Sequence, residues 1–369
     1  MRIVVTGATG FIGRNLCLRL KEAGHEPLGV TRESTRQDIL AQLARADAIV
    51  HLAGVNRAES SRVFEDGNAG FTESLCRWIA AESPKVPVIA SSSIQAGNDT
   101  TYGQSKLTAE HHLAALQAET GQPVAICRLV NVFGKWSRPN YNSVVATFCH
   151  NIARDLPIHI SDPMAKLHLV HVDDVIDDWL TFMISPRGGL TWLDAGAVYC
   201  TTLGELAVKI QSFRAIREHH TVGDVGTGLG RALYSTYVSF LPPDAFSYPL
   251  MVHGDERGRF VEMLRTQSSG QFSYFTAKPG VTRGGHYHHA KTEKFLVLQG
   301  KARFDFRNID TDETHVIETS GDHPEVVDTV PGWLHDITNV GDIELIVMLW
   351  ANELFDRDHP DTIQARVLS

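Results

Sequence analysis

Short apolar runs separated by longer helical segments, over the first 200 residues, constrain the fold of this chain more than any other feature. Near-continuous β-branched runs between crossover helices are typical of a parallel sheet that is covered on both faces. The pattern predicts an α/β domain of the Rossmann-like, doubly wound class. Its strands are expected at residues 2–5, 27–30, 48–52, 87–90 and 124–127.

The pattern changes from about residue 244 onward, where helical periodicity fades and short strands recur between turns. Strands are expected at residues 295–298, 302–306 and 344–348, an arrangement typical of an all-β sandwich or jelly roll. The glycine-rich stretch 223–243 ends in Pro242-Pro243 and is expected to contain the hinge. We therefore predict two domains, residues 1–243 and 244–369.

The charge balance argues against several classes of partner. The chain has 34 Lys and Arg against 43 Asp and Glu, a net charge of −9, which disfavours nucleic acid or an anionic membrane surface. No apolar run approaches the roughly 20 residues needed to span a bilayer. The first predicted strand begins at Arg2, so no secretory signal is expected, and the five scattered cysteines are typical of reduced thiols in a cytoplasmic protein.

A glycine-rich loop, Gly7-Ala8-Thr9-Gly10-Phe11-Ile12-Gly13, follows the first predicted strand and opens a helix. Glycines let the backbone approach a pyrophosphate, and a helix N-terminus supplies unpaired N–H groups and partial positive charge. This context indicates a dinucleotide-binding turn.

A tyrosine and a lysine four residues apart form the more specific signal. On a helix Tyr102 and Lys106 share one face, and the serines at 91–93 lie shortly upstream at the end of a predicted strand. A phenol has a pKa of about 10, so it needs a nearby cation to act as an acid or base near neutral pH. Lys106 is expected to supply that charge and to hold the ribose, while a serine hydroxyl polarises a substrate carbonyl.

Over roughly residues 1–220, these features resemble the extended short-chain dehydrogenase/reductases that act on nucleotide sugars. They follow one another along the chain in the same order as in that family. The stretches at 47–54, 128–134 and 171–175 complete the resemblance. It implies that Tyr102, Lys106 and either Ser93 or Ser92 are catalytic, with Asn131 at the sugar-nucleotide side of the cleft. The residues that it places on the dinucleotide are Gly7, Gly10, Phe11, Ile12, Gly13, Asp47, Leu52, Ala53, Gly54 and Lys106.

The end of the second predicted strand bears on the choice of dinucleotide. An NAD enzyme usually places a carboxylate there for the ribose 2′-OH, whereas an arginine accommodates the 2′-phosphate of NADP. Thr31-Arg32 follows this strand and favours NADPH, with Arg32 as the contact. Glu33 keeps NAD open, because it would serve if the strand ended one or two residues later.

Histidines and a glutamate at fixed spacing stand out in the second half. Gly280, His286, His288, Glu293 and Gly300 resemble the first cupin motif, and the segment 332–339, with His335, resembles the second. On a strand His286 and His288 point to the same face. With Glu293 and His335 they can close a site for Zn, Fe, Mn or Ni, of which we favour zinc because keto-sugar chemistry needs a Lewis acid and no redox change. The neighbouring His289 is expected to face away, at the surface.

A second resemblance concerns the segment 255–260 together with 283–286, which is similar to the deoxysugar epimerases of the cupin fold. It implies that Arg257 and Phe260 contact the sugar nucleotide. Those epimerases are metal-free, and their histidine that matches His286 removes a proton. Because a metal-bound imidazole nitrogen cannot also accept a proton, the base at C3 stays open.

The two chemistries share one carbonyl. A hydrogen next to a ketone is acidic because the enolate spreads its charge onto oxygen, and that acidity is lost once the ketone is reduced. Epimerisation must therefore precede reduction. The whole chain resembles the bifunctional capsule and O-antigen precursor enzymes of UDP-N-acetyl-L-fucosamine synthesis. That resemblance implies C3 epimerisation of a UDP-2-acetamido-2,6-dideoxy-4-hexulose by the cupin, then NADPH-dependent C4 reduction to UDP-2-acetamido-2,6-dideoxy-L-talose.

Two other readings stay open on the sequence. One is that the chain is a non-catalytic nucleotide-sugar sensor, although sensing needs no Ser/Tyr/Lys set. Alternatively, the cupin is only a structural or oligomerisation module of a 4-keto-sugar reductase. A homodimer is expected under either reading, since cupin sheet edges often pair between chains.

Overall fold

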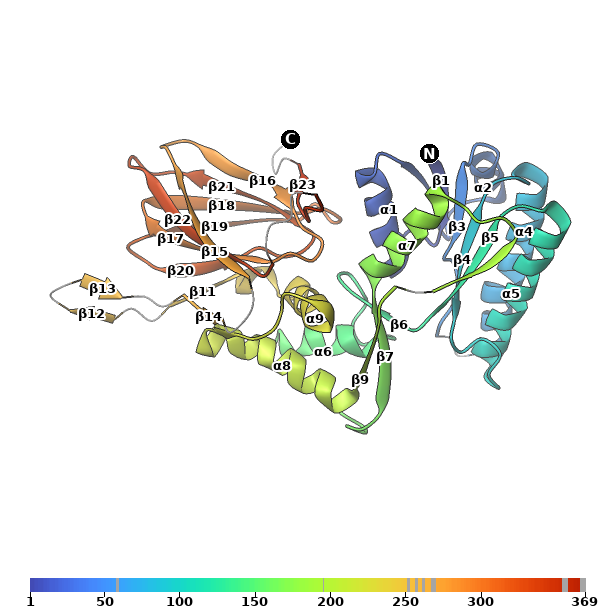
Figure 1. Ribbon diagram of the computed structural model, residues 1–369, viewed down its shortest axis with the longest axis horizontal. Coiled ribbons are helices and arrows are strands. Elements are labelled where there is room, and N and C mark those ends of the chain that lie inside the picture. Colours follow the sequence, from blue (N-terminus) through green and yellow to red (C-terminus); the bar gives the residue numbers. More distant parts are fainter. Residues whose placement is uncertain are drawn as a thin grey trace. The chain divides into compact units, whose positions relative to one another are not determined.

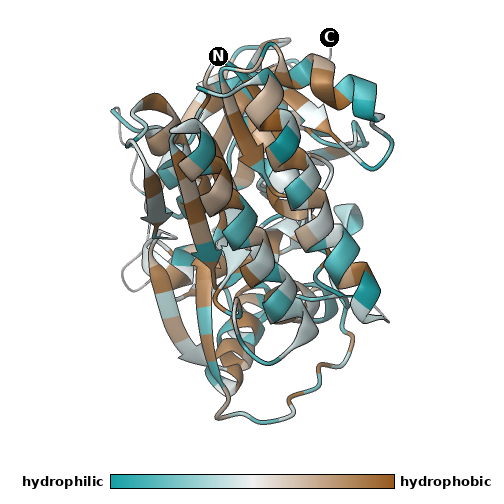
Figure 2. Ribbon diagram, turned by 90° about the vertical axis from the view of Figure 1, so that its right-hand side faces the viewer, coloured by the Kyte–Doolittle hydropathy of each residue, from teal (hydrophilic) through white to brown (hydrophobic). Residues whose placement is uncertain are grey.

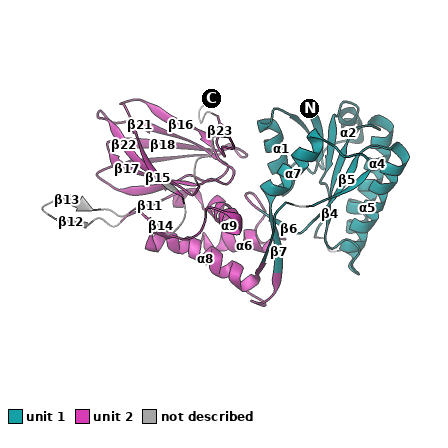
Figure 3. Ribbon diagram, viewed as in Figure 1, with its two compact units in different colours: residues 1–133, 167–200 teal, residues 134–166, 201–369 magenta. Residues whose placement is uncertain are grey.

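The structure is a computed structural model that describes residues 1–57, 60–194, 196–250, 253–255, 258–260, 263–266, 270–353 and 358–365. The chain divides into two compact units (Figure 3). One comprises residues 1–133 and 167–200, and the other comprises residues 134–166 and 201–369. Within the described residues, the helices lack the length and apolar character that a bilayer crossing requires.

The first unit is built on a six-stranded sheet with the order β2-β1-β3-β4-β5-β8 (Figure 1). Every pairing in this sheet is parallel, which confirms the predicted Rossmann-like class. The strands are β1 (Arg2–Thr6), β2 (Glu26–Val30), β3 (Ala48–His51), β4 (Val88–Ser93), β5 (Val124–Leu129) and β8 (Leu190–Leu193).

Helices cover both faces of this sheet because alternate strand residues point to opposite sides. In β1, Ile3 and Val5 join a core with α1 and α7, whereas Val4 joins a second core with α2, α4 and α5. Figure 2 shows hydrophilic and hydrophobic residues alternating along the helices, as expected of helices with one buried face. The helices are α1 (Phe11–Glu22), α2 (Arg36–Leu43), α3 (Ser61–Phe64), the π-helix η1 (Glu65–Gly70), α4 (Phe71–Glu82), α5 (Thr101–Thr120) and α7 (Val172–Ile184).

A small sheet follows the carboxyl end of β5. It has the order β6-β7-β9, and β6 pairs with β7 in parallel. These strands are β6 (Asn131–Phe133), β7 (Lys166–His171) and β9 (Val198–Thr202).

The second unit contains two five-stranded sheets, with the orders β11-β20-β17-β22-β15 and β19-β18-β21-β16-β23. Their pairings are antiparallel, and inward residues alternate with outward ones, as in β18, where Ala302, Phe304 and Phe306 are buried. The predicted all-β, cupin-like fold is thus confirmed. The main strands are β11 (Ser247–Pro249), β15 (Gln271–Ala277), β16 (Thr282–Tyr287), β17 (Glu293–Gln299), β18 (Lys301–Asn308), β19 (Thr314–Ser320), β20 (Glu325–Asp328), β21 (Trp333–Asn339), β22 (Leu345–Ala351) and β23 (Ile363–Gln364).

Helices and short elements complete this unit. The 3-10 helix η2 (Pro243–Ala245) precedes β11. The remaining elements are α6 (Val144–Ile152), α8 (Leu203–His219), α9 (Gly228–Ser239), β10 (Thr221–Val222), β12 (His253–Asp255), β13 (Gly258–Phe260) and β14 (Arg265–Thr266).

The glycine-rich stretch 223–243, expected to contain the hinge, holds the buried helix α9. Its Tyr234 and Tyr237 pack on Phe213 of α8, with ring centroids 5.2 and 5.9 Å apart. The glycines lie before and in the first turn, so they mark the start of a helix and not a long linker.

A buried ion cluster ties α8 to the β-sandwich of the same unit. Arg217 Nη1 lies 2.6 Å from Asp328 Oδ2, and Lys294 Nζ lies 2.5 Å from Asp328 Oδ1. The Arg217 guanidinium also stacks 4.2 Å from the Tyr248 ring centroid. Removing one partner would leave a buried charge uncompensated, which is strongly destabilising.

Candidate functional site

The glycine loop forms a tight turn between β1 and α1. Gly7 has a φ of +67°, its N–H donates to Val30 O at 2.9 Å, and a Cβ on it would lie 2.9 Å from Ala53 N. Gly10 is the N-cap of α1 and has no side chain with which to cap the helix. The first turn therefore presents backbone N–H groups, which suits a pyrophosphate.

The loop after β3 lies beside this turn. The Thr6 hydroxyl accepts the N–H groups of Leu52 at 3.1 Å and Ala53 at 3.0 Å. Gly54 follows, and a Cβ there would lie 3.5 Å from Lys106 Nζ. The structure therefore brings together the predicted cofactor residues of three segments, with Phe11, Ile12 and Gly13 in the first turns of α1.

Asp47 is a correction to the predicted cofactor set. It precedes β3, at the amino ends of the parallel strands, whereas the glycine loop lies at their carboxyl ends. The Asp47 carboxylate accepts the Arg2 N–H at 2.6 Å and pairs with the Arg2 guanidinium, and the backbone bond chiefly holds its pKa below the usual value. Asp47 thus ties β3 to β1 at the edge opposite the cofactor turn.

Arg32 lies in the turn that follows β2. It is exposed, and among the described residues its guanidinium makes no ion pair. The turn is closed by the Ser34 N–H, which donates to Thr31 O, and by the Thr31 hydroxyl, which accepts the Glu33 N–H at 3.2 Å. Arg32 and Glu33 are both exposed in the turn that follows the carboxyl end of β2.

Tyr102 and Ser93 meet at the junction of β4 and α5. Ser93 is the last residue of β4, Tyr102 is the second residue of α5, and their hydroxyls hydrogen-bond. Burial raises the pKa of Tyr102, and the bond with Ser93 partly offsets this rise. The expected effect of the Lys106 charge on the pKa of this phenol stays a prediction.

Ser92 faces the other way and corrects the alternative that it is the catalytic serine. Successive strand residues point to opposite faces, and its hydroxyl donates to Glu110 Oε1. Glu110 is buried on α5 and accepts two bonds from Arg128, at 2.9 and 2.7 Å. Of the two serines, Ser93 alone has its hydroxyl at Tyr102.

Lys106 donates to a backbone carbonyl and lies near a buried carboxylate. Its Nζ donates to Ser91 O at 3.2 Å, and Glu110 lies one helical turn further along the same face of α5. Burial lowers the pKa of Lys106 to about 8, and the Glu110 charge opposes that fall. Asn68 of η1 donates to Ser105 Oγ at 2.9 Å and so fixes the neighbouring turn.

Asn131 opens β6, just past the carboxyl end of β5. Its side chain is exposed, and its Nδ2 donates to His168 O at 3.1 Å. This position is at the same edge of the sheet as the glycine loop, as a substrate-side residue requires.

The four predicted metal ligands gather in the second unit. His286 lies in β16, His288 directly follows that strand, Glu293 opens β17 and His335 lies in β21. His286 is directly paired with His335 across the β16–β21 ladder. Their ligand atoms all lie within 4.8 Å of one another.

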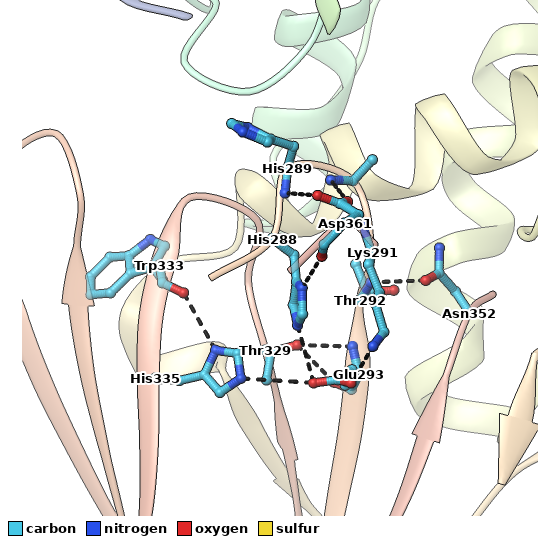
Figure 4. A network of polar contacts seen from close by, with 11 residues as sticks. His288, His289, Lys291, Thr292, Glu293, Thr329, Trp333, His335, Asn352 and Asp361 are labelled. Atoms are coloured by element: carbon cyan, nitrogen blue, oxygen red, sulfur yellow. Dashed lines mark hydrogen bonds and ion pairs between the residues drawn. The ribbon is translucent and has the colours of Figure 1, made fainter. Parts of the chain in front are cut away.

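The glutamate stands at the centre of this cluster (Figure 4). Glu293 Oε2 lies 3.2 Å from His288 Nε2 and 3.7 Å from His335 Nε2, and Oε1 lies 2.9 Å from Lys291 Nζ. His286 completes the group, with ring centroids 4.7 Å from His335 and 5.0 Å from His288.

Burial and charge shape the protonation of the cluster. Burial lowers the pKa of His335 to about 3, and the neighbouring histidines add to this fall, so its imidazole is neutral. Burial also lowers the pKa of His286. For Glu293 burial raises the pKa, but the hydrogen bond with His288 and the charges of His288, Lys291 and His335 outweigh it, so the pKa is lowered.

The donor set fits a divalent metal ion. Neutral imidazoles and a carboxylate are the ligands of Zn²⁺ and related ions, and His335 Nε2 is buried with no hydrogen-bond partner among the described residues. Two ligands about 2.1 Å from a tetrahedral ion lie roughly 3.4 Å apart, close to the observed spacing around Glu293 Oε2. The four predicted residues thus form a cluster whose spacing suits a metal ion.

Three further predictions have different outcomes. Arg257 lies outside the described residues, as does the side chain of Phe260 in β13. His289, expected at the surface, is buried instead, and its N–H donates to Asp361 Oδ1 at 2.8 Å. The strand ends at Tyr287, so the period-two rule no longer applies at position 289.

Several residues of these sites were missed by the sequence analysis. Glu110 follows Lys106 by four residues, so its helical spacing was a usable signal. Asn68 and Lys291 carried no spacing signal, and Asp361 is more than 70 residues from the histidines that it contacts.

Two family models match the chain in agreement with this architecture. The NAD dependent epimerase/dehydratase family matches residues 3–191, and the polysaccharide biosynthesis C-terminal domain matches residues 253–363. The chain belongs to the NAD dependent epimerase/dehydratase family, and its C-terminal part is a polysaccharide biosynthesis domain of cupin-like fold.

Within this class, one relative matches from end to end. The chain is 53% identical over 368 residues to the UDP-2-acetamido-2,6-beta-L-arabino-hexul-4-ose reductase of Pseudomonas aeruginosa, which covers 100% of this chain and 99% of the relative. The crystal structure of the capsular polysaccharide assembling protein CapF from Staphylococcus aureus is 40% identical, with a TM-score of 0.68 and full coverage of both chains. The UDP-glucose 4-epimerase of Thermotoga maritima, 21% identical with a TM-score of 0.52, covers 58% of this chain and 83% of its own, and supports the fold alone.

Proposed function

We propose that this protein is a bifunctional nucleotide-sugar enzyme with two sequential activities. Its cupin epimerises C3 of a UDP-2-acetamido-2,6-dideoxy-4-hexulose, and its Rossmann-like domain reduces the C4 ketone with NADPH to UDP-2-acetamido-2,6-dideoxy-L-talose. The observation that carries the proposal is the end-to-end likeness to a UDP-hexul-4-ose reductase, in a chain that presents both a Ser/Tyr/Lys set and a three-His, one-Glu cluster. We assign the activities to residues 1–243 for reduction and residues 244–369 for epimerisation.

The reductase step follows from the groups on β4 and α5. NADPH, when bound at the glycine loop, supplies the hydride. Tyr102 donates a proton to the ketone oxygen, and because burial raises its pKa, the nearby positive charge of Lys106 is needed to make the phenol an effective acid near neutral pH. Ser93 orients the same oxygen, and Lys106 contributes positive charge and holds the ribose.

The choice of NADPH over NADH rests on Arg32. Its exposed guanidinium at the carboxyl end of β2 is placed to accept a 2′-phosphate, for which Arg is well suited. Glu33 in the same turn would instead favour the free ribose hydroxyl of NAD, so the two side chains favour different dinucleotides.

The epimerase step needs a stabilised enolate. We assign His286, His288, Glu293 and His335 as ligands of Zn²⁺, which supplies Lewis-acid stabilisation of charge on the ketone oxygen when bound. Because its imidazole is committed as a ligand, His286 is not assigned as the base, and the residue that removes the C3 proton stays open. Arg257 and Phe260 are proposed to contact the sugar nucleotide.

The order of the steps follows from the substrate. The C3 hydrogen is acidic only while C4 is a ketone, so epimerisation precedes reduction, and reduction draws the epimerisation forward. A homodimer and a cytoplasmic location complete the proposal. The cupin sheet edges support the homodimer, and the scattered free cysteines support the cytoplasmic location.

Solvent isotope incorporation tests the proposal directly. The full chain, loaded with Zn²⁺, is incubated with the 4-keto UDP-sugar in deuterated water, with and without NADPH. We expect deuterium at C3 in both samples, but NADPH oxidation and a 6-deoxy-talose product only in the sample that contains NADPH, with the products analysed by NMR. An absence of both C3 deuterium and NADPH oxidation would contradict the proposal.

A further inference from the structure

Asp361, near the end of the chain, clamps the loop that carries His288 (Figure 4). Its Oδ1 accepts the His289 N–H at 2.8 Å, and its Oδ2 accepts the N–H groups of Ala290 and Lys291, both at 2.7 Å. Three consecutive backbone donors thus converge on one carboxylate. Charge-assisted bonds of this kind are about twice as strong as neutral ones, so the loop 289–291 is held in one conformation.

The main chain of Asp361 makes a second contact, with the imidazole itself. Its carbonyl oxygen lies within hydrogen-bond reach of His288 Nδ1. A carbonyl can only accept, so Nδ1 must carry the proton, and in the neutral ring Nε2 then presents its lone pair. A carbonyl that fixes the tautomer of a metal-ligating histidine in this way is a common partner in metal sites.

That lone pair points at another acceptor. His288 Nε2 faces Glu293 Oε2 at 3.2 Å, and His335 Nε2 faces the same oxygen at 3.7 Å. Lone pairs that converge at this distance repel unless a proton or a metal cation lies among them. By holding the proton on Nδ1, the Asp361 carbonyl leaves Nε2 free to bind a metal ion in place of the proton that it otherwise shares with Glu293.

The neighbouring strand holds Asp361 in register. β23 pairs with β16 through Gln364 opposite His286 and Ile363 opposite Tyr287, and the Ala365 N–H donates to Gly285 O at 2.8 Å. The segment 361–365 is thus bonded to the same strand end that carries two of the proposed ligands.

We propose that Asp361 is a positioning residue of the metal centre, which acts by ordering the His288 loop and fixing the His288 tautomer. The inference rests on the proposed metal-dependent epimerase function. It assigns to the C-terminal segment a part in metal binding that the ligand spacing does not indicate. Partners of this kind typically change metal affinity by about 10–100-fold when they are removed.

Zinc affinity of the full-length protein tests the inference. We compare wild type, Asp361→Ala and Glu293→Gln, with Asp342→Ala as the matched control. Asp342 is an exposed carboxylate in the turn between β21 and β22 of the same domain. Metal-free protein is titrated with Zn²⁺ against a chromogenic chelator, and a cooperative thermal unfolding transition of the unit that carries the cluster reports its correct folding.

We expect Asp361→Ala to weaken Zn²⁺ binding by about 10–100-fold, Glu293→Gln to weaken it further, and Asp342→Ala to match wild type. Thermal unfolding separates positioning from general support of the fold. The Zn²⁺-induced rise in Tm depends on affinity, so it should shrink in Asp361→Ala, whereas a merely structural residue would lower Tm equally with and without Zn²⁺.

Wild-type Zn²⁺ affinity in Asp361→Ala would overturn the inference. If that variant does not fold, Asp361→Asn decides in the same way, since its amide nitrogen cannot accept the loop N–H groups. If wild type and Glu293→Gln both fail to bind Zn²⁺, the proposed metal site fails, and the inference fails with it. If instead wild type binds Zn²⁺ and Asp361→Ala binds it equally well, the metal site stands and only the role of Asp361 is rejected.

Discussion

The candidate reductase site and the metal cluster are assembled in opposite ways. Ser93, Tyr102 and Lys106 come from one strand and the helix that directly follows it. The metal cluster draws His286, His288, Glu293 and His335 from three strands, and Asp361 closes it from near the chain's end. The first site depends on local geometry within a βα unit, and the second depends on correct pairing of distant strands.

This difference suggests that the two sites should respond independently to substitution. The reductase groups lie in the unit of residues 1–133 and 167–200, and the metal ligands lie in the other unit. A change at either site should therefore abolish one activity while it spares the other, unless the two sites are coupled.

The largest difference between the effects on the two activities is expected for Tyr102→Phe. Loss of the proton donor should lower the rate of NADPH oxidation by about 10²–10⁴-fold, because general-acid catalysis contributes on that scale. NADPH affinity and C3 deuterium incorporation should be unchanged, as measured by fluorescence titration and NMR. Loss of C3 exchange in this variant would show that the two sites are coupled.

The reciprocal change is Glu293→Gln, which removes the only carboxylate of the metal cluster. We expect C3 deuterium incorporation to fall by more than about 100-fold, since ligands matter more than their outer partners. Reduction of a substrate already epimerised at C3 should proceed at the wild-type rate. A matching loss of reduction would favour a structural role for the cupin over a catalytic one.

Arg32→Ala tests the choice of dinucleotide within the reductase alone. Loss of the guanidinium should weaken NADPH binding about 10-fold, the effect of losing roughly 1.4 kcal/mol of charge-assisted contact, and should leave NADH binding nearly constant. Arg36→Ala, an exposed arginine in the first turn of α2, is the control. An equal loss of affinity for NADPH and NADH would show that Arg32 does not contact the 2′-phosphate.

The smallest expected effect is a change of pH profile in Glu110→Gln. Lys106 is charged below its pKa of about 8, and the Glu110 carboxylate raises that value. Reduction that depends on the Lys106 charge should therefore fall as pH rises through about 8, and this fall should move to lower pH in the variant. Glu119→Gln, exposed near the end of α5, should keep the wild-type profile. An unshifted profile in Glu110→Gln would contradict the role of Glu110.

Local spacing explains which site residues could be predicted. Tyr102 and Lys106 were found because a helix places i and i+4 on one face, and His286 and His288 because a strand repeats every two residues. The same rules failed for Ser92, since its side of the strand could not be chosen, and for His289, since the strand ends before it. Asp47 could have been excluded from the sequence, because it precedes the predicted strand 48–52, whereas the dinucleotide binds at the carboxyl ends of parallel strands.

The sequence alone determined the two fold classes, the glycine turn and the candidate ligands, because each depends on hydrophobic periodicity or on fixed spacing within a short segment. Only the tertiary structure decided that Ser93 faces Tyr102, that Arg128 pairs with Glu110, and that Asp361 holds the His288 loop. These contacts join residues whose separation along the chain has no fixed period. They exist only once strand register and helix packing have brought distant side chains together.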